Sequence, residues 1–139
     1  MIIGYKKQFP WGTPTFFDRK ILVGEKEHTI RADIHDRWHE GRKINHCHGV
    51  RTKYFDNFYN NKCTGTQRIY IGKTNTPYAN LYYRHNGINY GVIVDGRRLT
   101  NLQIILLAFR DGFDSTHDFF RWFQNGFKGK IIHWTPLRY

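Results

Sequence analysis

The chain has 139 residues and carries 22 lysines and arginines against 11 aspartates and glutamates, a net charge of +11. Hydrophobic residues make up 40% and aromatic residues 17% of it, which excludes a disordered tail because there is ample apolar surface to bury. The length predicts a single domain, residues 1–139, and the longest largely apolar run, residues 102–109, is far below the ~20 residues of a membrane span.

The first half of the chain predicts short strands around one helix. Residues 1–9 have the pattern of a strand. Thr13 and Pro14 then predict the start of a helix, as N-cap and first-turn proline, and Gly24 predicts its end. Two further strands are expected, over about residues 28–32 and 43–50.

The second half predicts a strand over residues 66–71, followed by two tight turns. Asn86-Gly87 is a dipeptide favoured in hairpins, and we expect it to join residues 81–83 to residues 90–94. Asp95-Gly96 predicts a second turn directly after that hairpin.

Two helices and a closing strand, residues 130–134, are expected next. Thr100 or Asn101 caps the first helix and Gly112 ends it; the second begins at Asp114 or Ser115. Residues with core-facing helical spacing are Leu102, Ile105, Leu106 and Phe109 in the first, and Phe119, Phe120, Trp122 and Phe123 in the second. Strands outnumber helices without regular alternation, so we expect an α+β fold, a curled sheet or small barrel with about three helices packed on it.

Positive charge is concentrated between Gly41 and Lys73, where Asp56 is the only acidic residue. The basic and aromatic side chains there are Arg42, Lys43, Arg51, Lys53, Lys62, Arg68 and Lys73, with Tyr54, Phe55, Phe58 and Tyr59. Cations beside aromatic faces suit single-stranded nucleic acid, because charge follows the phosphates while rings stack on bases. The composition therefore predicts RNA or a nucleotide as partner; a solvated basic face with core aromatics is the other interpretation. Trp38, in a polar segment, is a further candidate for base stacking.

A candidate catalytic set lies between the first helix and the next strand. Lys26 follows Gly24 in a turn, and Thr29 and Arg31 lie two apart on one strand face. This places an amine, a hydroxyl and a guanidinium near each other. The set suits a threonine nucleophile activated by lysine, with arginine holding a carbonyl, phosphate or carboxylate. A polar strand without a catalytic role is the other interpretation.

Asp111 falls in the last turn of its helix, just before Gly112, where the negative end of the helix dipole disfavours a carboxylate. A carboxyl group in this position, if partly buried, suits general acid–base catalysis. Alternatively, Asp111 caps a loop or pairs with a base such as Arg110.

His46-Cys47-His48 and Cys63 raise the question of a zinc site. On a strand, His46 and His48 point one way and Cys47 the other, and the spacing matches no known zinc motif. The chain also lacks a phosphate-binding Gly-rich loop and kinase or serine-hydrolase signatures. We therefore expect no metal and no cofactor.

The N-terminal segment reaches Lys6 and Lys7 before an apolar signal sequence can form, and Cys47 and Cys63 are too few for a disulfide framework. We expect a cytoplasmic protein without membrane attachment.

The residues around Lys26 resemble the ASCH domain family of the PUA-like superfamily. The family's motif G-x-K-x-x-E-x-R is matched by Gly24, Lys26 and Arg31, and Thr29 stands in place of the glutamate. That replacement resembles the bacterial acetylcytidine amidohydrolase branch, to which further residues are similar: Phe16-Phe17, Ile21-Leu22, Thr29-Ile30-Arg31, Trp38 and Gly41.

The resemblance implies a small PUA-like mixed β-barrel with peripheral helices and a cleft lined by the motif. It assigns catalysis to Lys26, Thr29 and a glutamate before the final helix, whose place Asp111 takes here. Residues 52–99 have no counterpart in this alignment.

The leading hypothesis is therefore an ASCH-type protein that binds RNA or a modified nucleoside in a basic cleft and removes an N-acyl group from a cytosine-type base. Thr29 would be the nucleophile, Lys26 its activator and Asp111 the acid–base group. Substrate-binding residues would be Arg31, Trp38, Arg51 and Lys53. A non-catalytic RNA-binding module and a ribonuclease are the alternatives.

Overall fold

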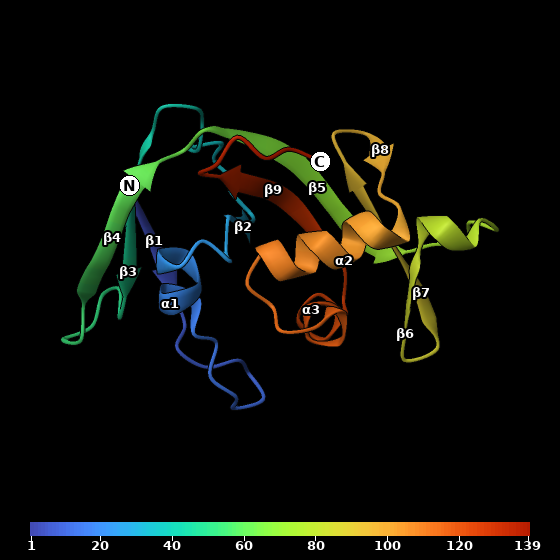
Figure 1. The fold of residues 1–139 in the computed structure, drawn as a ribbon, viewed down its shortest axis with the longest axis horizontal. Coiled ribbons are helices and arrows are strands. Elements are labelled where there is room, and N and C mark those ends of the chain that lie inside the picture. The colour runs from blue at the N-terminus through green and yellow to red at the C-terminus, as the bar shows by residue number, and fades with distance from the viewer.

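Two open sheets carry the strands in the computed structural model, which describes residues 1–139 (Figure 1). In the smaller sheet, β3 (Lys43–His48) lies between parallel β1 (Ile2–Tyr5) and antiparallel β4 (Asp56–Lys62). The larger sheet has the order β2-β9-β5-β7-β6, and β8 (Arg97–Arg98) also pairs with β7. Its other strands are β2 (His28–Arg31), β5 (Gly65–Lys73), β6 (Tyr83–His85), β7 (Ile88–Val94) and β9 (Phe127–His133).

Three α-helices complete the α+β fold: α1 (Phe17–Leu22), α2 (Asn101–Arg110) and α3 (Thr116–Trp122). A short 3-10 turn spans Ala79–Leu81. Figure 1 shows α2 and α3 against one face of the larger sheet, with α1 beside β1. None of the three helices has both the length and the apolar character needed to cross a membrane.

The sheets do not close into the barrel that we expected. No backbone ladder joins β1 to β2, which belong to different sheets. A side chain spans the gap instead: Arg31 Nη2 donates a hydrogen bond of 2.8 Å to the Gly4 carbonyl oxygen. The space between these two strand edges is where the candidate site lies.

Helix α1 begins later than Thr13 and Pro14 predicted. Pro14 forms an isolated bridge with Gln8, and the Thr15 hydroxyl donates to the Lys6 carbonyl oxygen, so this stretch folds back on the chain after β1. The helix starts after Phe16, without a side-chain cap. Its end at Gly24 is confirmed, because Gly24 has the positive φ of 83° that favours glycine.

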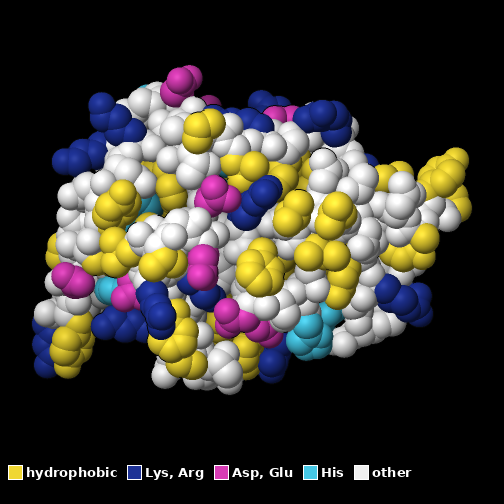
Figure 2. All heavy atoms as spheres, in the orientation of Figure 1, with side chains coloured by type: hydrophobic (Ala, Val, Ile, Leu, Met, Phe, Trp, Pro, Cys, Tyr) yellow, Lys and Arg dark blue, Asp and Glu magenta, His cyan; other side chains and the backbone are white.

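The face of α2 that packs on the core differs from the predicted one. Leu102 and Phe109 are 65% and 57% exposed. Figure 2 shows hydrophobic side chains on the surface over α2. The buried positions are Ile104, Leu107 and Ala108. Because residues 102–109 are apolar on every side of the helix, helical spacing alone fits more than one face. Contact with the sheet and α3 selects the buried one.

Local signals elsewhere are confirmed. Thr100 and Gln103 form a capping box at the start of α2, and Ser115 caps α3. Asn86-Gly87 and Asp95-Gly96 all have positive φ, as two-residue hairpin turns require. Strand β4 was not predicted, because its sequence DNFYNNK is polar and most of its side chains are exposed.

Candidate active site

A pocket of about 360 Å³ opens in the gap between β1 and β2. Four of the predicted site residues line it together: Lys26, Thr29, Arg31 and Asp111. Aromatic side chains from α1, from α3 and from the segments around α3 form its apolar wall: Phe17, Phe113, Trp122, Phe123 and Phe127. A concave site with an apolar wall and a few convergent polar groups is typical of small-molecule binding.

Lys26 is the buried cation of this pocket, with 2% of its surface exposed. Its Nζ donates to the carbonyl oxygens of His28, at 2.9 Å, and of Asp111, and it lies 3.6 Å from Asp111 Oδ1. The Phe17 ring centroid is 4.8 Å away on its other side. Burial lowers the pKa of Lys26 to about 8, against the opposing effect of the Asp111 carboxylate. The amine is therefore mostly protonated at pH 7, and its neutral fraction, which can accept a proton, grows as the pH rises toward 8.

Asp111 is the C-cap of α2, where sequence reasoning placed it. Gly112 follows with a φ of 96°, and a Cβ there would meet the Phe17 ring at 2.9 Å and Lys26 Cδ at 3.0 Å. The glycine thus lets the chain turn close to Lys26, so that both the carbonyl and the carboxylate of Asp111 reach the amine. The Asp111 side chain is only 6% exposed.

His28 contacts Asp111 without lining the pocket, and the sequence analysis missed it. Its fully buried ring joins Asp111 Oδ1, 3.1 Å from Nδ1, to the Tyr139 hydroxyl, 2.6 Å from Nε2. Burial lowers the pKa of His28 and raises that of Tyr139, so both are neutral near pH 7. Since the carboxylate accepts, Nδ1 carries the proton and Nε2 accepts from Tyr139.

Thr29 and Arg31 form the opposite edge of the pocket. The Arg31 Nε donates to Thr29 Oγ1 at 3.2 Å, and its guanidinium lies 5.2 Å from the Tyr5 ring centroid. Together with the bond to Gly4, these contacts hold the guanidinium in place. Thr29 and Lys26 both line the pocket, but Thr29 Oγ1 and Lys26 Nζ do not hydrogen-bond to each other.

A second buried histidine, His46, holds the side chain of Tyr5, which lines the pocket. His46 Nδ1 lies 2.8 Å from the Tyr5 hydroxyl, and His46 Nε2 lies 2.7 Å from Asn61 Oδ1. Burial lowers the pKa of His46 to about 4 and raises that of Tyr5. The Tyr5 hydroxyl therefore donates to a neutral imidazole, which fixes the ring that Arg31 packs on.

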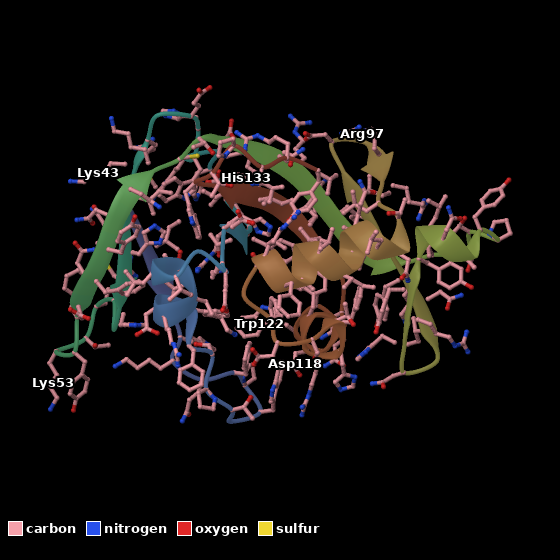
Figure 3. All side chains as sticks on the ribbon, in the orientation of Figure 1. Lys43, Lys53, Arg97, Asp118, Trp122 and His133 are labelled. Atoms are coloured by element: carbon pink, nitrogen blue, oxygen red, sulfur yellow. The ribbon has the colours of Figure 1, made fainter.

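The remaining predicted substrate-binding residues lie elsewhere. Trp38 is 7% exposed and belongs to the hydrophobic core, so its ring does not present a stacking face to the pocket. Arg51 and Lys53 lie in the exposed loop between β3 and β4. Figure 3 shows Lys53 at the tip of this hairpin, apart from Trp122 at the pocket wall. Arg51 and Lys53 were predicted from the local composition, and Trp38 from its polar surroundings and the family resemblance. None of these signals determines the distance of a residue from Lys26.

No group of three histidine, cysteine or acidic side chains is placed to hold a metal ion. The His46 and His48 rings instead lie against Phe58. The centroid of the Phe58 ring is 6.2 Å from that of His46 and 4.7 Å from that of His48.

Comparison with known proteins gives no match: no family model, no curated protein and no solved structure matches the chain. The resemblance to the ASCH domain family stays a prediction.

Proposed function

We propose that this protein is an amidohydrolase of the ASCH type, which takes a modified nucleoside into the pocket between β1 and β2 and removes an N-acyl group from a cytosine-type base. The supporting observation is that Lys26, Thr29, Arg31 and Asp111 line one pocket. Its volume of about 360 Å³ is in the range of small-molecule sites and suits a single nucleoside.

The reaction begins with attack of Thr29 Oγ1 on the carbonyl carbon of the N-acyl group, while neutral Lys26 takes the hydroxyl proton. Arg31 lies beside Thr29 Oγ1 and stabilises the negative oxygen of the tetrahedral intermediate. Collapse of the intermediate breaks the C–N bond, and the Lys26 ammonium returns the proton to the leaving amine. Water then hydrolyses the acyl-threonine and releases the carboxylic acid. In place of the acid–base role expected from the sequence, we assign Asp111 the orientation of the Lys26 amine, which lies 3.6 Å from its carboxylate.

The test is release of cytidine from acetylcytidine by the purified protein. Thr29→Ala and Lys26→Met should each lower kcat by at least about 100-fold, the scale of general base and nucleophile losses. Thr29→Ser is the matched control, because it keeps the hydroxyl and should keep measurable turnover. Full activity in Thr29→Ala, with the protein folded by circular dichroism, contradicts the mechanism.

A non-catalytic RNA-binding module is the second candidate, favoured by the net charge of +11 and by Tyr54, which is 73% exposed beside Lys53. It predicts RNA affinity that falls steeply with salt, that Thr29→Ala leaves unchanged and that neutralising Arg51 and Lys53 abolishes. Cleaved RNA in the same assay would indicate a ribonuclease.

A further inference from the structure

A second hollow, of about 860 Å³, adjoins the pocket across the end of β1. The two share Gly4, Tyr5 and Lys6 as lining residues, so they are neighbours along the end of β1. We call this second space the outer hollow; Lys6 and Lys7 line it on one side and Thr52 and Tyr54 on the other.

The outer hollow differs from the pocket in its charge. Two exposed lysine side chains, Lys6 and Lys7, line it, and no carboxylate does. Asp18, which lies with Lys7 around a smaller neighbouring hollow, is paired with His48 Nε2 at 3.3 Å. The two lysines therefore carry positive charge without an acidic partner among the lining residues.

The loop between β3 and β4 extends this positive charge. Arg51 and Lys53 flank Thr52, and the Lys53 amine lies 5.2 Å from the ring centroid of exposed Tyr54. Clustered amines with a hydroxyl and an exposed aromatic ring suit a phosphate attached to a sugar, since lysine binds phosphate as a point charge.

We propose that the outer hollow is a phosphate subsite, so that the preferred ligand is a nucleotide whose base enters the pocket and whose sugar phosphate lies against Lys6 and Lys7. Lys6 lines both spaces and marks the junction between base and phosphate. Only the identity of the base rests on the proposed amidohydrolase function. The phosphate can belong to a free mononucleotide or to one unit of an RNA strand.

The test compares the affinities of cytidine, of cytidine 5′- and 3′-monophosphates and of a five-nucleotide RNA by titration calorimetry. None of these ligands carries an acyl group, so binding is measured without turnover. We expect at least one monophosphate to bind on the order of 10-fold more tightly than cytidine, with an advantage that salt reduces. Lys6→Ala/Lys7→Ala should remove that advantage, so that the affinity for the monophosphates falls far more than the affinity for cytidine.

Lys73→Ala/Arg84→Ala is the matched control, because it removes two exposed cations from another part of the surface and should keep the preference. Equal affinity for cytidine and both monophosphates, or equal weakening of all ligands by the Lys6/Lys7 variant, overturns the phosphate subsite. An RNA advantage over the monophosphates that Arg51→Ala/Lys53→Ala removes assigns the phosphate to a strand; no such advantage assigns it to a mononucleotide.

The two proposals fail separately. Phosphate-dependent binding without acetylcytidine turnover would refute the amidohydrolase and keep the subsite. Turnover of acetylcytidine without any preference for phosphate would refute the subsite and keep the amidohydrolase.

Discussion

Lowering the pH from 7 to 5.5 should destabilise this protein through its buried histidines. His28, His46 and His133 are fully buried. Burial lowers the pKa of all three, to about 4 for His46 and about 3 for His133. In the unfolded chain each returns to about 6.5. Below about pH 6.5 these histidines therefore bind protons in the unfolded state but stay neutral in the folded state. The free energy of unfolding falls as the pH drops from about 6.5 toward the histidine pKa values of the folded state.

The magnitude follows from these values. For a histidine that stays neutral in the fold, the free energy of unfolding is about 1.2 kcal/mol lower at pH 5.5 than at pH 7. His46 and His133 together give about 2.5 kcal/mol, and His28 acts in the same direction. For a chain of this size, that corresponds to a fall in Tm on the order of 10 °C.

The assay is thermal unfolding by circular dichroism at constant ionic strength. His46→Gln should reduce the difference in unfolding free energy between the two pH values by about 1.2 kcal/mol, whatever its effect at pH 7. His35→Gln, at an exposed position, should leave that difference unchanged. A Tm that is the same at pH 7 and pH 5.5 would show that the buried histidines are not held neutral.

Three further outcomes can be measured by urea unfolding or by activity. Tyr139→Phe should cost about 1–3 kcal/mol, because His28 Nε2 loses its partner in a buried site; a change below about 0.5 kcal/mol would contradict that network. Ile104→Ala should cost about 2–5 kcal/mol and Leu102→Ala less than about 1, the opposite of what the predicted helix face requires. Trp38→Phe should lower stability yet leave the KM for acetylcytidine unchanged, whereas a raised KM would indicate that Trp38 contacts the base.

The parts of the fold that could be predicted are those set by neighbouring residues. Asn86-Gly87 dictates a tight turn wherever it occurs between two strands, and Thr100 with Gln103 dictates a helix start. Strand β4 and the buried face of α2 depend instead on distant partners. The polar β4 segment forms a strand because it pairs with β3 through backbone hydrogen bonds. Ile104 is buried because the sheet and α3 cover that side of the helix.

The candidate site divides in the same way. Lys26, Thr29 and Arg31 lie within six positions of each other, so the sequence alone indicates that they are close in space. Asp111 was found from its place at a helix end and from the family resemblance. His28 was overlooked because strand alternation turns it away from Thr29 and Arg31, toward Asp111. Nothing in the local sequence connects His28 to Tyr139, which is 111 residues away.

The failure of the barrel prediction and the existence of the pocket have one structural cause. Had β1 and β2 paired through their backbones, the Gly4 carbonyl would be bonded within the ladder and the space between the strands would be closed. Arg31 takes the place of that ladder, with one nitrogen on Gly4 and another on Thr29. A side chain holds the edges together while leaving room for a ligand, and it presents its charge to that ligand. Arg31, which links the edges of β1 and β2, is therefore also the residue that we expect to stabilise the negative charge formed in the reaction.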